Sequence, residues 1–264
     1  RRQRRPPVAA KLGALAALRA PPASPDPFAV PMLFDFLQKA SRNARSGARS
    51  LVDDGFAATV RALLGRVSAS ELGLRRGDAT SLRGQKVPVG FIDIYSGEEL
   101  EVCVFAMSKG SRIPLHDHPG MHVFGRVLFG KMRVTAYTPL RRLAEDEEGL
   151  SPARAGSGYW AALHEDAVLG PQPANFELAP VVGNLHEVVA LEDAAFLDIT
   201  TPPYDDRAGR PCNYYDAELL GGPAARAWEA AGGEGALYKV TPSDYPGMPA
   251  QRVEYRGPAY PARP

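Results

Sequence analysis

Hydrophobic and polar residues alternate with two different periods along this chain. Between residues 32 and 67 the apolar side chains recur at helical spacing, which predicts one helix beginning at Met32 and another over 51–67. From about residue 87 the period falls to two, which is typical of strands with one buried and one exposed face. The alternation predicts strands at 91–95, 100–106, 123–129, 132–137, 176–182, 187–190, 195–200 and 236–240.

Two helices followed by many closely spaced strands predict a mainly β protein, a small barrel or sandwich with an N-terminal helical cap. The 26 glycines and 25 prolines favour short strands and turns over long helices. Strands 123–129 and 132–137 are expected to form a hairpin across Gly130 and Lys131. The stretch 141–175 shows little periodicity and is expected to be an inserted loop with short structured pieces.

The first residues differ in charge from the rest of the chain. Residues 1–25 carry six basic side chains and no acidic one, and they are rich in alanine. This composition is typical of an organelle transit peptide, although a disordered tail or upstream sequence before a start at Met32 explains it too. We therefore expect a disordered or targeting leader at 1–31, a helical segment at 32–80 packing on the barrel, and the barrel domain at 81–264.

Composition narrows the classes of function. Hydrophobic residues make up 45% of the 264 positions, which is enough for a sizeable core. The formal net charge is +1, so no global field attracts nucleic acid or an acidic membrane, and neither partner is expected. The longest apolar run, 12–18, is too short to span a membrane. Two cysteines cannot build a disulfide framework and favour a reducing, cytoplasmic or nuclear location.

The candidate chemistry lies in the histidines. The chain has five, and His116, His118 and His122 fall within seven residues. Side chains at i and i+2 of a strand leave the same face, so His116 and His118 can present two adjacent metal ligands. His186, which opens another alternating strand, is the best third ligand, whereas His164 lies in the predicted loop. An isolated His-x-His pair is more often incidental than a metal site.

The surrounding glycines change that balance. Gly110 precedes the pair at a Gly-x5-His-x-His spacing, and Gly183 precedes His186 at a Gly-x2-His spacing. Together they resemble the two sequence motifs of the cupin barrel. In the general cupin pattern a glutamate ligand follows His-x-His by four or five positions, but those positions here are His122 and Val123. A three-histidine site without an acid is therefore expected, with His122 packing or hydrogen-bonding behind it rather than serving as a fourth ligand.

A longer set of ordered motifs resembles one family, the cysteamine dioxygenases and plant cysteine oxidases. The matching segments keep their order and cover roughly residues 88–216; they are PLHDHPGM at 114–121, VLFG at 127–130, GNLH at 183–186, FLDI at 196–199 with PPY at 202–204, and GRPCNYY at 209–215. The resemblance implies a cupin-type (double-stranded β-helix) barrel that holds Fe(II). It also implies an enzyme that uses O₂ to convert a thiol into a sulfinic acid.

The implied chemistry suits the residues. Imidazole is a good ligand for Fe(II), and three histidines leave up to three coordination positions open for substrate and oxygen. Three neutral ligands leave the site with a charge of +2, so a substrate thiol would bind as its thiolate. No 2-oxoacid cosubstrate is then needed, because the thiol supplies the electrons.

The resemblance assigns roles to four more residues. Asp198, expected on the strand adjacent to that of His186, is a candidate site carboxylate that orients a ligand or accepts a hydrogen bond from the substrate's ammonium; the alternative is a buried structural Asp. Tyr204 follows two prolines and is a candidate to point its hydroxyl at the metal, the alternative being a packed loop residue. Cys212 and Tyr214 form a Cys-x-Tyr pair that is crosslinked in some family members, and the uncrosslinked state stays open here.

Two substrates compete within the resemblance. One is free cysteamine, which would give hypotaurine, and the other is the N-terminal cysteine of a protein, oxidised as an oxygen-dependent degradation signal. Both present a thiol two carbons from a free amine. Residues 123–124 and 128–130 are closer to the plant enzymes, which favours the N-terminal cysteine. A three-histidine zinc cupin with hydrolase, lyase or isomerase activity and a non-catalytic binding cupin remain alternatives. The chain is expected to act as a monomer.

Overall fold

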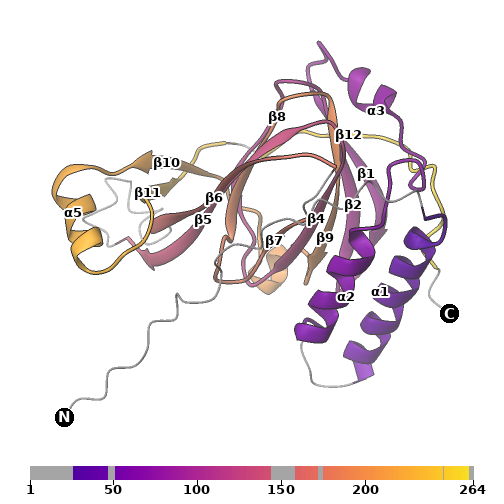
Figure 1. Ribbon diagram of the computed structural model, residues 1–264, viewed down its shortest axis with the longest axis horizontal. Helices are drawn as coiled ribbons and strands as arrows, with labels where there is room; N and C mark the ends of the chain where they lie inside the picture. The colour runs from indigo at the N-terminus through magenta and orange to yellow at the C-terminus, as the bar shows by residue number, and fades with distance from the viewer. Residues whose placement is uncertain (1–25, 47–50, 144–157, 172–174, 246, 262–264) are drawn as a thin grey trace.

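The computed structural model describes residues 26–46, 51–143, 158–171, 175–245 and 247–261. Its strands form two six-stranded sheets that face each other (Figure 1). The first sheet has the order β12-β1-β2-β9-β4-β7, with strands Gln251–Arg252, Val89–Ser96, Glu101–Met107, Ala194–Thr201, His122–Phe129 and Asn175–Leu178. The second has the order β10-β11-β6-β5-β8-β3, with strands Tyr215–Leu219, Leu237–Pro242, Tyr159–Leu169, Met132–Arg142, Leu185–Ala190 and Arg112–Asp117.

From β3 to β9 the chain alternates between the two sheets, except that β5 and β6 pair with each other in the second sheet. Side chains of both sheets fill the space between them. This double-stranded arrangement is a cupin-type barrel, so the predicted fold class is confirmed. β9 lies in the middle of the first sheet, and all eight of its residues are buried. Both of its faces are covered, because the barrel interior lies on one side and the N-terminal helices lie on the other.

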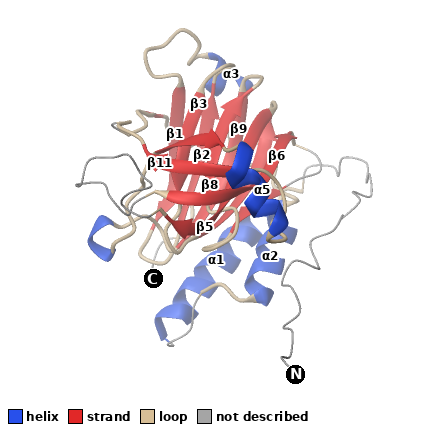
Figure 2. Ribbon diagram, turned by 90° about the vertical axis from the view of Figure 1, so that its left-hand side faces the viewer, coloured by secondary structure: helices blue, strands red, loops and turns tan. Residues whose placement is uncertain are grey.

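The helices cover the outer face of the first sheet (Figures 1 and 2). They are α1 (Ala29–Ser46), α2 (Asp54–Leu64) and the short α3 (Arg76–Thr80). The buried side chains of α1 recur at helical spacing, at Ala29, Val30, Leu33, Phe34 and Leu37. α2 begins at an Asp53 N-cap, whose side chain accepts a hydrogen bond from the Phe56 amide at 2.7 Å. The first helix thus starts before Met32 and continues to Ser46.

Two sequence-based expectations are wrong. β4 and β5 do not form a hairpin, because they belong to different sheets and the chain crosses the barrel between them. Gly130 makes that crossing at φ +76°, where a Cβ would lie 2.2 Å from the Asp193 carbonyl oxygen. The stretch 141–175, expected to be an inserted loop with only short structured pieces, contains the 11-residue strand β6, which pairs with both β5 and β11.

Other parts of the chain differ less from expectation. The remaining predicted strands are present within a few residues, while β10, β12 and helix α5 (Gly222–Ala230) were not anticipated. Of the leader predicted at 1–31, residues 1–25 lie outside the described residues, whereas 29–31 belong to α1. Residues 144–157 and 172–174 of the predicted loop also lie outside the described residues. Among the helices that are described, no segment has the length and apolar character needed to cross a membrane.

Candidate metal centre

Three histidines converge inside the barrel, and they are those that the sequence pattern grouped. His116 on β3 lies directly opposite His186 on β8 in the antiparallel ladder, and His118 follows the end of β3. The His186 Nε2 atom lies 3.1 Å from His118 Nε2 and 3.2 Å from His116 Nε2. All three side chains are buried. In the described part of the chain no acidic side chain joins this group as a further ligand.

Hydrogen bonds to the outer nitrogens of two rings keep the nitrogens that face the site unprotonated. His116 Nδ1 lies 2.8 Å from the Pro114 carbonyl oxygen and donates to it, because a carbonyl can only accept. The Tyr204 hydroxyl lies 2.7 Å from the Asp117 carbonyl oxygen and 2.9 Å from His118 Nδ1. It therefore donates to the carbonyl and accepts from the His118 Nδ1–H. Both rings then present an unprotonated Nε2 to the centre of the site.

Burial keeps the imidazoles neutral, which is the form that binds metal. It lowers the pKa of His116 to about 4 and lowers the pKa of His118 and His186 well below the ordinary value. The inward-facing lone pairs of His116 and His118 lie on either side of His186 Nε2, and the Nδ1 atom of His186 has no partner in the described structure. Metal–imidazole bonds of about 2.1 Å place neighbouring nitrogens about 3 Å apart, as found here. The residues therefore fit one divalent metal ion.

A cavity of about 220 Å³ lies beside the histidines, between the two sheets. Its apolar lining includes Phe105, Ile113 and Phe196, and its polar lining includes Glu101, Asp198 and Thr200. Gly125 on β4 leaves room for the Phe176 ring, since a Cβ there would lie 1.9 Å from that ring. The ring of Phe176 in turn packs against His186, with 6.1 Å between ring centroids. The site is therefore a largely apolar chamber with one polar wall.

Asp198 reaches this chamber from the sheet opposite His186. The expectation of an adjacent strand was wrong, because the chain crosses from β8 in the second sheet to β9 in the first. The side chain is buried, and its Oδ1 atom has no hydrogen-bond partner in the described structure. Burial, with a smaller effect from the charge of Glu101, raises the pKa of Asp198 to about 8. An unpartnered carboxylate facing a metal site is a functional-site signal.

Cys212 and Tyr214 form the rim of the chamber. The Cys212 thiol interacts with the hydroxyls of both Tyr204 and Tyr214, and burial raises its pKa. The Tyr214 hydroxyl also accepts a hydrogen bond from the Met248 amide at 3.1 Å. Cys103 is buried and lies on the polar wall beside Asp198, its partner in the β2–β9 ladder. Whether Cys212 and Tyr214 crosslink stays a prediction.

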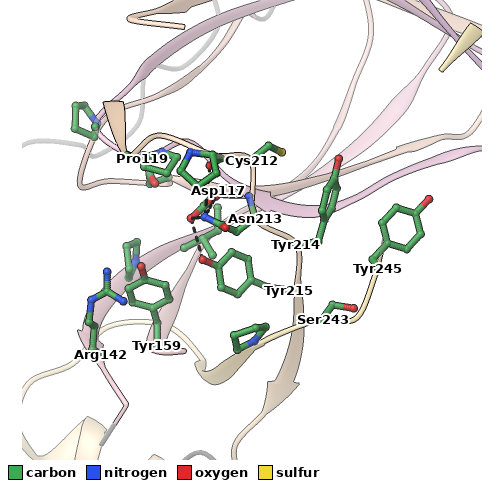
Figure 3. A pocket seen from close by; sticks show the side chains of 18 residues that line it. Asp117, Pro119, Arg142, Tyr159, Cys212, Asn213, Tyr214, Tyr215, Ser243 and Tyr245 are labelled. Atoms are coloured by element: carbon green, nitrogen blue, oxygen red, sulfur yellow. Dashed lines mark hydrogen bonds between the residues drawn. The ribbon is translucent and has the colours of Figure 1, made fainter. Parts of the chain in front are cut away.

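The same rim residues border a second, larger groove of about 660 Å³ (Figure 3). Asp117 forms its floor and is held by Asn213, whose amide nitrogens donate to it, and by the Tyr215 hydroxyl at 2.9 Å. Sequence reasoning missed this network. The signal was available, because Asp117 lies between two inward-facing histidines on a strand and its side chain must point the opposite way.

The other two histidines lie outside the cluster. His122 opens β4 with its ring stacked near Phe124, at 6.4 Å between centroids. Phe124 packs against Phe56 of α2, so His122 is on the helix-facing side of the sheet. His164 is exposed on β6, beside Gly183. Neither ring lines the metal chamber.

The barrel and its three-histidine pocket define a cupin-type protein with a metal-binding site. The PCO_ADO family model matches residues 63–259, so this chain belongs to that family. It is similar to 2-aminoethanethiol dioxygenase of Homo sapiens, with 32% identity over 66% of this chain and 71% of that protein. It is also similar to plant cysteine oxidase 2 of Arabidopsis thaliana, with 28% identity over 70% of this chain and 65% of that protein. The family is one of thiol dioxygenases, which are oxidoreductases.

The alignments thus span about two thirds of the length of these curated relatives. Among solved structures, KdgF from Halomonas sp. is similar at 20% identity and a TM-score of 0.31, covering 45% of this chain and 83% of that one. An RmlC-like cupin protein from Desulfovibrio desulfuricans is similar at 19% identity and a TM-score of 0.29, covering 44% and 83%.

Proposed function

We propose that this protein is an Fe(II) thiol dioxygenase that oxidises the N-terminal cysteine of a protein or peptide to cysteine sulfinic acid. The thiol and one O₂ combine, so that both oxygen atoms end on sulfur and the sulfur is oxidised while O₂ is reduced. The observation that carries the proposal is the set of three converging neutral imidazoles without an acidic ligand. His116, His118 and His186 would hold the iron, which supplies the redox chemistry with O₂ when bound.

The protein's own residues would position the substrate and the ligands. The Tyr204 hydroxyl fixes the ring of His118 through its Nδ1 atom. Asp198 faces the chamber with an unpartnered oxygen, which suits the ammonium that lies two carbons from the thiol. Phe105 and Phe196, stacked at 5.2 Å between centroids, line the chamber with apolar surface that excludes water from the sulfur.

The groove beside the chamber supports a peptide substrate. Cys212 and Tyr214 line both the small chamber and the 660 Å³ groove, so the residues that follow the cysteine would pass these two side chains to reach the groove. Cysteamine has no such continuation and would use the chamber alone. Cysteamine remains the second candidate, because the identity to the mammalian 2-aminoethanethiol dioxygenases, 32% and 34%, exceeds that to the plant oxidase.

In the decisive experiment the protein is purified without oxygen and analysed for metal. A Cys-initiated peptide or cysteamine is then supplied together with O₂. Metal analysis of that protein is expected to find iron, whereas zinc would support the hydrolase or isomerase alternative. Mass spectrometry of the peptide is expected to show a gain of about 32 Da on the cysteine, from two oxygen atoms. A gain of one oxygen, a disulfide, or no change with iron-loaded protein would overturn the proposal. Higher kcat/KM for cysteamine than for the peptide would favour the second candidate.

A further inference from the structure

The chamber wall opposite the histidines is built by the neighbouring strands β2 and β9. In their antiparallel register Glu101 pairs with Thr200, and Cys103 pairs with Asp198. Alternate residues of a strand face the same side, so these four side chains point together into the chamber that they line. Glu101 is the outermost of them and is half-buried, while Thr200 and Asp198 are buried.

This wall holds polar oxygen atoms without hydrogen-bond partners. Asp198 Oδ1 and Thr200 Oγ1 are fully enclosed, and neither has a hydrogen-bond partner among the described residues. Glu101 forms no ion pair in the described structure, and its donor is the Ser96 hydroxyl at 3.4 Å. Burial and the nearby Asp93 raise the pKa of Glu101. Leaving enclosed polar groups unsatisfied is costly, so the wall is suited to a donor from outside the chain.

We propose that Glu101, Asp198 and Thr200 form a subsite for a primary ammonium group, in which Glu101 is a specificity-determining residue. The inference rests on the proposed function, since it assigns this subsite to the amine of the thiol substrate. An ammonium carries three N–H donors, and the wall offers one acceptor group on each of the three residues. A divalent ion and a bound ammonium both favour the ionised form of Asp198. The divalent ion, the thiolate, the ammonium and the two carboxylates then leave the chamber without net charge.

The same wall discriminates between amines. Free cysteine carries a carboxylate on the carbon that bears its amine, which would place a third negative charge beside Glu101 and Asp198. In an N-terminal cysteine that carboxylate is replaced by a neutral peptide group. Because like charges repel strongly in a partly desolvated site, the subsite favours peptide N-termini and cysteamine over free cysteine.

The test measures binding rather than turnover. Isothermal titration calorimetry without oxygen compares cysteinamide with free cysteine on the metal-loaded protein, since the two ligands differ only in the carboxylate. The wild type is expected to bind cysteinamide about tenfold more tightly than cysteine, the effect of one charged hydrogen-bonding partner. Glu101→Gln should weaken cysteinamide binding about tenfold and bring the two affinities close together. Glu98→Gln removes the same charge from an exposed neighbouring position and should leave both affinities unchanged.

Several outcomes overturn the subsite. The wild type could bind neither cysteinamide nor cysteine, or could bind both with the same affinity. The Glu101→Gln protein could also bind both ligands with wild-type affinities. Circular dichroism and a thermal midpoint check that the variant folds, and Glu101→Thr, which suits a strand, replaces it if it does not. Selective binding of cysteinamide without oxidation of any thiol would sink the proposed function and leave the ammonium subsite standing. Oxidation of the peptide thiol together with unchanged selectivity in Glu101→Gln would overturn the ammonium subsite and leave the proposed function standing.

Discussion

The two walls of the chamber are made from different sheets and are satisfied in different ways. The histidine wall, on β3, β8 and the segment after β3, has hydrogen bonds behind His116 and His118 that fix how both rings point. The opposite wall, on β2 and β9, leaves buried oxygen atoms of Asp198 and Thr200 without partners. The histidine wall therefore fixes two of its three rings within the protein, and among its ligand rings only His186 has an outer nitrogen without a partner in the described structure. The other becomes complete only when a molecule with donors enters.

This difference separates holding a metal from selecting a substrate. Because the functions lie on different sheets, changes on one wall should affect metal content and changes on the other should affect substrate use. The barrel makes this possible, since its sheets face each other across the chamber while their residues are distant in the sequence. Substitutions on each wall test whether the two functions separate in this way.

The largest effect is expected from His186→Ala. This change removes one of three ligating nitrogens at the centre of the histidine wall, so the variant should purify without iron and should not oxidise thiols. Metal analysis by mass spectrometry and an oxygen electrode measure the two losses. Full iron occupancy in a folded His186→Ala protein would contradict the ligand assignment.

Asp198→Asn tests the other wall. The variant should keep its iron, because Asp198 lies on the sheet opposite the ligands, but its kcat/KM should fall about 100-fold with loss of a charged hydrogen bond to the substrate. Steady-state oxidation of a Cys-initiated peptide measures the rate, and metal analysis provides the control. Loss of iron together with activity would show that the walls do not act separately.

Sequence patterns predicted the histidine wall much better than the carboxylate wall. His116 and His118 are two residues apart, so strand periodicity alone places them together, and the Gly-x2-His motif marks His186. Glu101 escaped notice because its pairing with Thr200 depends on the register of strands 99 residues apart. Local alternation shows which way a side chain points, but it does not show which distant strand lies beside it.

The same limit explains the errors in the fold. Period-two alternation found most strands, yet it cannot assign β4 and β5 to different sheets, because crossing the barrel and turning back in a hairpin look alike locally. β6 escaped because its hydrophobic pattern is weak: one of its buried positions is Ala161, and Val168 is exposed. A strand whose buried face is built from small residues loses the contrast on which periodicity depends.

The two walls should also respond to pH in opposite directions in metal-free protein. The pKa of Asp198 is raised to about 8 in the folded state, so the folded protein holds a proton that the unfolded chain releases above about pH 4. Its contribution to stability is therefore lost as pH rises between those values, by up to about 1.4 kcal/mol per pH unit. The histidines, whose folded pKa values are lowered, instead destabilise the fold as pH falls below about 6.5.

Urea denaturation at pH 6.0 and 7.5 measures this contrast. Over that interval the unfolding free energy of Asp198→Asn relative to wild type should rise by about 2 kcal/mol, because the amide does not titrate. Equal pH dependence of the two proteins would mean that Asp198 is ionised throughout, and that its unpartnered oxygen does not disfavour the charged form.

Tyr204→Phe should have a smaller effect, and on the histidine wall alone. Without the hydroxyl, His118 loses the acceptor for its Nδ1–H but keeps its inner nitrogen in place, so the iron is retained and the rate falls about tenfold. A KM for the peptide close to the wild-type value would separate this positioning role from substrate binding. A rise in KM with unchanged kcat would instead assign Tyr204 to the substrate.

His122→Ala should have the smallest effect, although this histidine lies only four residues from His118. It opens β4 on the face that packs toward α2, stacked near Phe124, and lines no part of the chamber. Iron content should therefore equal that of the wild type, and peptide oxidation should stay within about twofold. The lost packing should lower the unfolding free energy by about 1 kcal/mol, measured by urea denaturation. A folded, metal-free His122→Ala protein would reveal a fourth histidine ligand, and the histidine wall would then extend onto the opposite sheet.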